Sequence, residues 1–178
     1  MIVPGGAARK LDEAGLYEYA VRALGGRAHS IGELKEKLRR RAGRADDVER
    51  VVARLKEHGY LDDRRFAESF AAARLENHRL GRTRVLRDLR QRRVAPALAE
   101  RTVGQLYRQV DEAALIDEWI RRRLRAAPRD QKELASAYRR LLRAGFGSGE
   151  ILRALKKLAA HPELLEGFEP PDQDGEES

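Results

Sequence analysis

The sequence contains no cysteine, only six prolines and few aromatic residues, which make up 6% of the chain. The absence of cysteine excludes disulfide frameworks, thiolate zinc sites and cysteine nucleophiles, and it fits a reducing compartment. No stretch approaches the roughly 18 consecutive apolar residues that a membrane-spanning helix needs. The first ten residues also lack the apolar segment of a signal peptide. We therefore expect a cytoplasmic protein without a membrane partner.

Charge, in contrast, is abundant and unbalanced. Charged residues make up 37% of the 178 residues, and 37 Lys and Arg against 29 Asp and Glu give a net charge of +8 and an isoelectric point near 10.1. A typical soluble domain is only about one quarter charged. Such a surface attracts anions, and the length suits one ordinary domain or a short array of small ones.

The last part of the chain differs in charge from the rest. Residues 160–178 contain no Lys or Arg, and three prolines and Gly175 interrupt them. This composition predicts a disordered acidic tail, which either aids solubility or imitates nucleic acid and screens the basic body. Residues 1–10 are predicted to be a flexible N-terminus. The acidic residues of the tail are Glu163, Glu166, Glu169, Asp172, Asp174, Glu176 and Glu177.

The body between these ends has the apolar periodicity of helices, with apolar residues recurring at spacings of three and four. Ser30 and Glu33 form a predicted capping box, and Asp62 or Asp63 is a predicted N-cap. Pro96 suits a first helical turn and Gly59 a helix end. The predicted helices are 12–24, 31–41, 46–58, 63–78, 82–92, 96–107, 111–126, 130–143 and 149–159.

The helices repeat with a period of about fifty residues. The apolar pair of the second helix in each group is Leu34/Leu38, then Val85/Leu89, then Leu134/Tyr138, so the registers lie 51 and 49 residues apart. One such group is too small to bury its apolar stripes alone, so neighbouring groups should stack. The sequence predicts an all-α tandem repeat of three three-helix modules, 11–60, 61–109 and 110–159, with an elongated and curved body.

No residue pattern indicates catalysis, a metal site or a cofactor. His29, His58, His78 and His161 are scattered, and none has a second ligand at the spacing of a zinc helix. The glycines at 145, 147 and 149 match no phosphate-binding motif and predict a turn between helices. Trp119 lies at helical spacing and is predicted to be a core residue. We therefore expect a protein that is not an enzyme.

The basic residues lie on the helix faces opposite the apolar stripes. Placed at 100° intervals, they leave little acid on these faces, so several could merge into one anion-attracting surface. The predicted binding residues for a protein partner or for nucleic acid are Arg84, Arg87, Arg90, Arg121, Arg122, Arg125, Arg139, Arg140, Arg143, Arg153, Lys156 and Lys157.

Three segments of the chain carry a family resemblance. The most specific runs from Leu61 to Phe70 (LDDRRFAESF) and is followed by Arg74. The others are HSIGELKEKL at 29–38 and GRTRVLRDLRQ at 81–91, with Val85 and Asp88 as mild departures. Together these segments resemble the RecX family of regulatory proteins. The resemblance covers about residues 14–159. We interpret the signature as mainly structural, and its residues are Leu61, Asp62, Asp63, Phe66, Ala67, Phe70 and Arg74.

The resemblance implies a tandem three-helix fold and a non-enzymatic role in DNA repair, recombination and the SOS response. It implies binding to the RecA recombinase, as monomer and as nucleoprotein filament, and restraint of filament extension, ATP hydrolysis, strand exchange and co-protease activity. Single- or double-stranded DNA would be contacted mainly through its phosphates, and the protein is expected to be a monomer without a cofactor. The residues leave an alternative open, a helix-turn-helix-like DNA-binding protein that acts without RecA.

Overall fold

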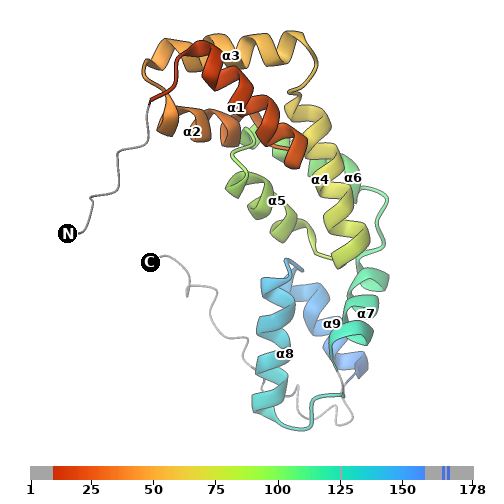
Figure 1. Ribbon diagram of the computed structural model, residues 1–178. Coiled ribbons are helices and arrows are strands. Elements are labelled where there is room, and N and C mark those ends of the chain that lie inside the picture. Colours follow the sequence, from red (N-terminus) through yellow and green to blue (C-terminus); the bar gives the residue numbers. More distant parts are fainter. Residues whose placement is uncertain (1–9, 125, 159–165, 167, 169–178) are drawn as a thin grey trace, which may run out of the picture. The chain divides into compact units, whose positions relative to one another are not determined.

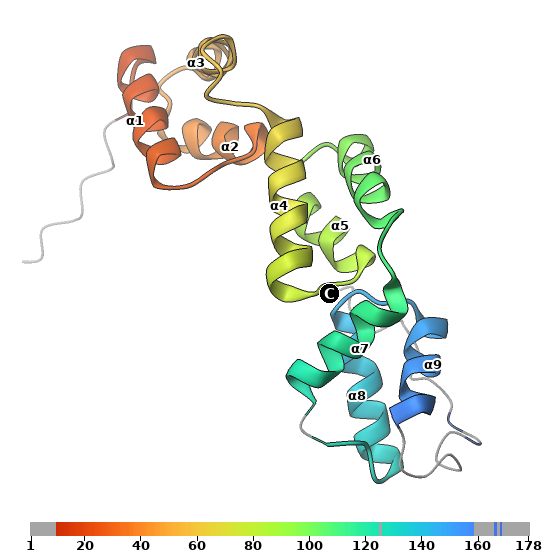
Figure 2. The ribbon, with the colours of Figure 1, turned by 90° about the vertical axis from the view of Figure 1, so that its right-hand side faces the viewer.

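The computed structural model describes residues 10–124, 126–158, 166 and 168, and within them the chain forms nine α-helices (Figures 1 and 2). An isolated bridge joins Leu11 and Ala42. The prediction of an all-α chain is confirmed, and each predicted helix lies within three residues of its observed bounds. These are α1 (Glu13–Gly26), α2 (Ile31–Arg41), α3 (Ala45–Glu57), α4 (Asp63–His78), α5 (Arg82–Gln91), α6 (Pro96–Tyr107), α7 (Glu112–Arg123), α8 (Gln131–Arg143) and α9 (Ser148–Leu158).

The predicted signals at the helix ends are present. Ser30 and Glu33 form a capping box at the start of α2. The backbone of Gly59, just after α3, has a positive φ of 72°, which glycine adopts at little cost. α6 begins at Pro96, whose missing N–H is not needed in a first turn. Local sequence therefore determines where these helices begin and end.

Asp62, just before α4, and Asp63, its first residue, cap different helices. Oδ1 of Asp62 accepts hydrogen bonds from the backbone amides of Arg64 and Arg65, at 2.9 and 3.0 Å, and so caps α4 itself. Oδ1 of Asp63 instead accepts the backbone amide of Ile31 at 2.7 Å, which is a free donor at the start of α2. The signature thus ties together two helices that begin 32 residues apart in the sequence.

The described residues form two compact units, and the chain passes between them within the middle helices. The first unit contains residues 10–70 and Leu89–Thr102. Its main core lies where α1, α2 and α3 pack together. The buried residues of this core are Leu16, Ala20, Leu34, Leu38, Val48, Val51, Val52, Leu55 and Leu61.

The second unit contains Ala71–Asp88 and the described residues from Val103 onward. Its core lies between α7, α8 and α9, which Figure 2 shows side by side. Trp119 is 5% exposed, which confirms its predicted place in the core. The largest buried side chains here include Tyr138, Phe146, Ile116, Leu134, Leu141, Ile151 and Leu155.

Each unit contains one contact in which a glycine meets the backbone that follows a helix. A Cβ on Gly32, in α2, would lie 2.5 Å from the carbonyl oxygen of Arg93, just after α5. A Cβ on Gly81, just before α5, would lie 2.3 Å from the carbonyl oxygen of Gly145, just after α8. Arg93 and Gly145 both have positive φ, of 57° and 92°. We call these two contacts the glycine junctions, and neither has space for a side chain.

Several predictions fall on residues outside those that the structure describes. These are the flexible N-terminus up to residue 9, Arg125, His161 and most of the acidic tail. The three module boundaries also remain predictions. Among the described residues no helix is both long enough and apolar enough to cross a membrane.

Candidate anion-binding site

Three of the predicted binding residues line one cavity in the second unit. Arg84 reaches it from α5, and Arg140 and Arg143 reach it from α8. The cavity has a volume of about 310 Å³ and is also lined by Arg74, Arg123, His78 and Trp119. It therefore brings five guanidinium groups together with a single carboxylate, that of Asp88. We call it the arginine cavity.

The Asp88 carboxylate forms ion pairs with two of these arginines. Its carboxylate is 6% exposed and lies 2.9 Å from Nε of Arg84 and 3.2 Å from Nε of Arg74. The Arg84 side chain is 40% exposed and also donates to the carbonyl of Arg143 at 3.3 Å. A buried carboxylate with two arginine partners orients guanidinium groups that are still open to solvent. Arg84 and Arg74 are thus held in place rather than freely solvated.

The indole of Trp119 supports two further arginines. The guanidinium carbon of Arg123 lies 5.2 Å from the ring centroid and that of Arg140 lies 5.8 Å from it. Arg140 donates to the carbonyl of Arg123 at 2.9 Å, and Arg123 donates to the carbonyl of His78 at 3.1 Å. Stacked guanidinium groups keep N–H donors for a phosphate or carboxylate ligand. Arg143 is exposed, and among the described residues no acidic side chain pairs with it.

The remaining predicted binding residues do not join the arginine cavity. Arg121 and Lys157 line a separate cavity between α7 and α9, together with Asp117. Arg139 and Lys156 are exposed, and Arg87 is exposed on α5. Three others are each paired with a carboxylate: Arg90 with Glu100, Arg122 with Glu118 and Arg153 with Glu150.

The prediction that these basic faces hold little acid is therefore wrong. Arg84 pairs with Asp88 and Arg122 with Glu118, each four residues apart on one helix. Arg79, which also belongs to the second unit, donates to Glu118 and lowers the pKa of that carboxyl below its usual value. Side chains at this spacing are neighbours on a helix, so the pairs could have been found in the sequence. Projecting the basic residues alone onto a helical wheel does not reveal these ion pairs.

Arg74 and Arg123 are the residues of the cavity that sequence reasoning missed. Arg74 follows the signature, and its interpretation as mainly structural leaves out its place in the cavity beside Asp88. Arg123 ends α7 and was not among the predicted binding residues. Its position near Trp119, one turn earlier, is a local signal that the sequence offered.

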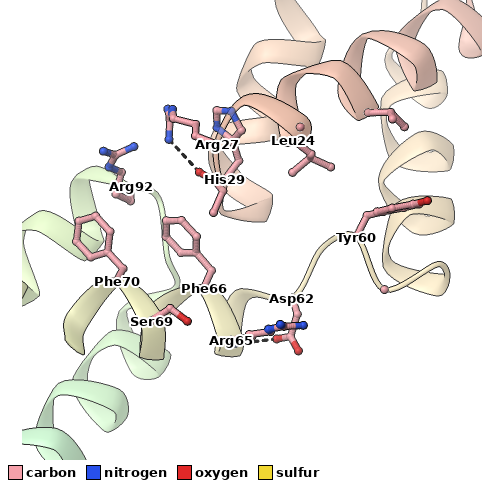
Figure 3. A pocket seen from close by; sticks show the side chains of 14 residues that line it. Leu24, Arg27, His29, Tyr60, Asp62, Arg65, Phe66, Ser69, Phe70 and Arg92 are labelled. Carbon is pink, nitrogen blue, oxygen red and sulfur yellow. Dashed lines mark hydrogen bonds between the residues drawn. The ribbon is translucent and has the colours of Figure 1, made fainter. Parts of the chain in front are cut away.

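The signature also lines a cavity, in the first unit. Phe66 and Phe70, interpreted from the sequence as mainly structural, are only half-buried. Their rings stack with centroids 5.7 Å apart. Figure 3 shows them projecting from α4 into a cavity of about 790 Å³. Ala67, between them, is fully buried, as expected of a structural residue.

His29 lies beside this cavity and gives the first unit a predicted dependence on pH. Its side chain is 1% exposed, and its Nδ1 lies 3.5 Å from Oε2 of Glu33. Burial lowers the pKa of His29 below its usual 6.5, the charges of Arg27 and Lys37 lower it further, and Glu33 opposes them. Protonation therefore favours the unfolded chain, so stability is complete above about pH 6.5 and falls as the pH drops.

We expect the melting temperature to fall between about pH 7.5 and pH 5.5, measured by circular dichroism. The variant His29→Asn should melt lower at neutral pH but lose most of this pH dependence. The exposed His78 is the matched control, and His78→Asn should retain the wild-type dependence. An unchanged pH dependence in His29→Asn would contradict the assignment to His29.

The helices of the described residues define a class, that of all-α proteins. Comparison with known proteins narrows the class. Residues 17–55 match the family model of the first three-helix domain of RecX, and residues 62–103 match that of the second. The chain is 37% identical over 167 residues to the regulatory protein RecX of Deinococcus radiodurans, covering 93% of this chain and 75% of that protein. This chain belongs to the RecX family of regulatory proteins.

Two further comparisons agree with this assignment. The regulatory protein RecX of Halorhodospira halophila is 35% identical over 136 residues, which cover 76% of this chain and 83% of that protein. The crystal structure of RecX from Lactobacillus salivarius has a TM-score of 0.66 at 20% identity and covers 83% of this chain and 96% of that chain. The structural likeness supports the fold, an all-α helical repeat. The relatives from Deinococcus radiodurans and Halorhodospira halophila are both named as regulatory proteins.

Proposed function

We propose that this protein binds the RecA recombinase and its nucleoprotein filament in the cytoplasm and restrains filament extension, ATP hydrolysis, strand exchange and co-protease activity. Membership of the RecX family supports the choice of partner. The observation that carries the proposal is the arginine cavity, because it gathers five guanidinium groups around one carboxylate. A DNA phosphate or an acidic side chain of the filament is the ligand that such a cavity attracts.

The contact chemistry follows from the two kinds of arginine in the cavity. Arg74 and Arg84 are held by Asp88, and Arg123 and Arg140 rest on Trp119. Arginines whose orientation is already fixed lose less side-chain entropy when they bind a phosphate. Arg143 is exposed and has no acidic partner among the described residues. Its charge is therefore the one that a variant can reverse with the least effect on folding.

The test is co-sedimentation with RecA on single-stranded DNA, with ATP hydrolysis followed in the same samples. We expect Arg143→Glu to weaken binding about tenfold, because one attraction is replaced by a repulsion. The binding constant K falls as salt rises. Each lost phosphate contact should make the plot of log K against log salt less steep by about 0.7 to 0.9. Arg84 and Arg140 are poorer choices, because their reversal breaks contacts with Asp88 and Trp119.

Arg129→Glu is the matched control. Arg129 is exposed in the same unit, lies outside the arginine cavity and precedes α8, where added acid suits the helix start. It should leave inhibition unchanged. Equal inhibition by wild type and Arg143→Glu, with equal melting, would remove the cavity from the interface. Selection of one DNA sequence without RecA would instead favour the helix-turn-helix-like alternative.

A further inference from the structure

The cavity in the first unit has the features of a docking site. It has a volume of about 790 Å³ and lies between the end of α1, the loop after α3 and the first half of α4 (Figure 3). Its apolar wall contains Leu24, Phe66 and Phe70. Val21 and Tyr60, at 38% and 56% exposed, are the large hydrophobic side chains exposed in the described chain, and both line this cavity. We call it the aromatic cavity.

Exposed apolar side chains gathered at one cavity indicate an interaction surface. Isolated exposed hydrophobic residues are common on protein surfaces, but their concentration in one place is not. Here Val21 comes from α1 and Tyr60 from the loop after α3, so no local sequence requirement places them together. The wall also includes Phe66 and Phe70, whose stacked rings are only half-buried. An apolar side chain of a ligand inserted in the cavity would remove part of this exposed apolar surface from water.

The charge around the aromatic cavity is mostly positive. Arg27, Arg65 and Arg92 line it, against one carboxylate, that of Asp62. Oδ1 of Asp62 accepts two backbone amides at the start of α4. Among the described residues no acidic side chain pairs with the guanidinium of Arg65. This arginine therefore offers all its N–H donors to a ligand.

The other two arginines share one carboxylate. Nη1 of Arg92 lies 2.9 Å from Oε1 of Glu33, and the guanidinium of Arg27 lies 3.4 Å from the same carboxylate. Burial would raise the pKa of Glu33, but hydrogen bonds from Arg27 and Arg92 lower it, so Glu33 remains charged at neutral pH. The guanidinium of Arg92 also lies 5.5 Å from the ring of Phe70. Because two guanidinium groups share one carboxylate, some of their N–H donors remain for an acidic side chain of a ligand.

We propose that the aromatic cavity binds an acidic peptide segment of a partner protein, with a leucine or phenylalanine of that segment inserted against Phe66 and Phe70. Charge complementarity selects this occupant, because the guanidinium groups surround an apolar floor. A basic or purely apolar ligand would leave Arg65 without an acidic partner and would add none for Arg27 and Arg92, which share Glu33. The proposal goes beyond the role of the arginine cavity and does not depend on it.

The test measures peptide binding to the full-length chain by fluorescence anisotropy, with neither RecA nor DNA present. The probe is a labelled helical peptide of about twelve residues with two leucines one turn apart and glutamate at most other positions. One control peptide carries lysine in place of glutamate, and another carries alanine in place of leucine. We expect the acidic leucine peptide to bind at least about tenfold more tightly than either control.

Two variants locate the binding. Arg65→Glu should weaken binding of the acidic probe about tenfold, and Arg65 is exposed, so the variant should melt like wild type. Phe66→Ala should weaken it about thirtyfold through loss of the apolar contact. Arg44→Glu is the matched control, since Arg44 is exposed at the start of α3 in the same unit and does not line the cavity. It should bind like wild type.

Four results would overturn the proposal. The first is equal binding of the acidic and lysine peptides, and the second is unchanged binding to Arg65→Glu. In the third, Arg143→Glu abolishes binding while Arg65→Glu does not, which would place the peptide at the arginine cavity. In the fourth, another occupant is found, either a peptide of residues 160–178 that outcompetes the probe or a dimer, seen by sedimentation, that Phe66→Ala dissociates. Because RecA is absent, none of these results would contradict the proposed function.

Discussion

The variant Asp88→Asn is expected to make the second unit less stable while making the arginine cavity bind anions more tightly. The substitution keeps the shape of the side chain but removes the charge that pairs with Arg74 and Arg84. Removing one partner of a fully buried ion pair costs about 3 to 5 kcal/mol. Here the arginines are 30% and 40% exposed and regain water, so we expect a loss of about 2 kcal/mol in the free energy of unfolding. The melting temperature should fall by about 6 °C.

Binding should change in the opposite direction, because removing the Asp88 charge from a cavity lined by five arginines outweighs the loss of the fixed orientation of Arg74 and Arg84. If the proposed function holds, the plot of log K against log salt for single-stranded DNA should become steeper by up to about 0.7, the equivalent of one additional phosphate contact. Urea denaturation and DNA binding at several salt concentrations would measure the two effects. Asp117→Asn is the control, because it removes the same charge from an exposed position of α7. Lower stability together with weaker binding would show that Asp88 organises the cavity for its ligand.

The variant Gly145→Ala should cause a large loss of stability, because the glycine has a positive φ and its neighbours leave no space for a side chain. Gly145 has a φ of 92°, which costs a residue with a side chain about 1 to 2 kcal/mol. The added Cβ would also lie 2.3 Å from the backbone nitrogen of Arg84. Overpacking of this kind costs about 1 to 3 kcal/mol. We expect a loss of about 3 kcal/mol and a fall of about 10 °C in the melting temperature.

Gly147→Ala, two residues later, is a matched control with the opposite expectation. A Cβ at Gly147 has no atom within 4 Å, and its φ lies outside the positive range. Its effect on the melting temperature should be small, within about 0.5 kcal/mol of wild type. The same glycine junction holds α5 near α8, where Arg84 donates to the carbonyl of Arg143. If the proposed function holds, Gly145→Ala should therefore also weaken inhibition of RecA. Equal melting temperatures of Gly145→Ala and Gly147→Ala would contradict the expected strain at this junction.

The helices could be predicted because their signals are local. Periodic apolar residues mark each buried face, and the pairs Leu34/Leu38, Val85/Leu89 and Leu134/Tyr138 are all buried as expected. Caps such as Ser30 and Pro96 act within one turn of their own position. The end of α7 was placed three residues too late, because Leu124 leaves the helix in an extended conformation despite its apolar character.

The candidate sites depend on contacts that the sequence does not record. Nothing near Asp63 indicates that it caps a helix beginning at Ile31, and nothing near Gly81 indicates that it meets Gly145. The aromatic cavity is similar, since Val21, Tyr60 and Phe66 come from three separate segments. Phe66 and Phe70 are four residues apart and so share one helix face, but this spacing cannot say whether another helix covers that face. In the structure both line the aromatic cavity and are half-buried.

The glycine junctions have a consequence for how such a chain can be rebuilt or can diverge. Each brings a glycine against backbone and Cβ atoms of the opposite segment, so the fit at that point depends on a hydrogen in place of a side chain. A segment grafted from a distant relative at either junction would have to supply a glycine there. Fusing halves of two such proteins should therefore fail wherever the junction glycine is lost, even where the neighbouring side chains are compatible.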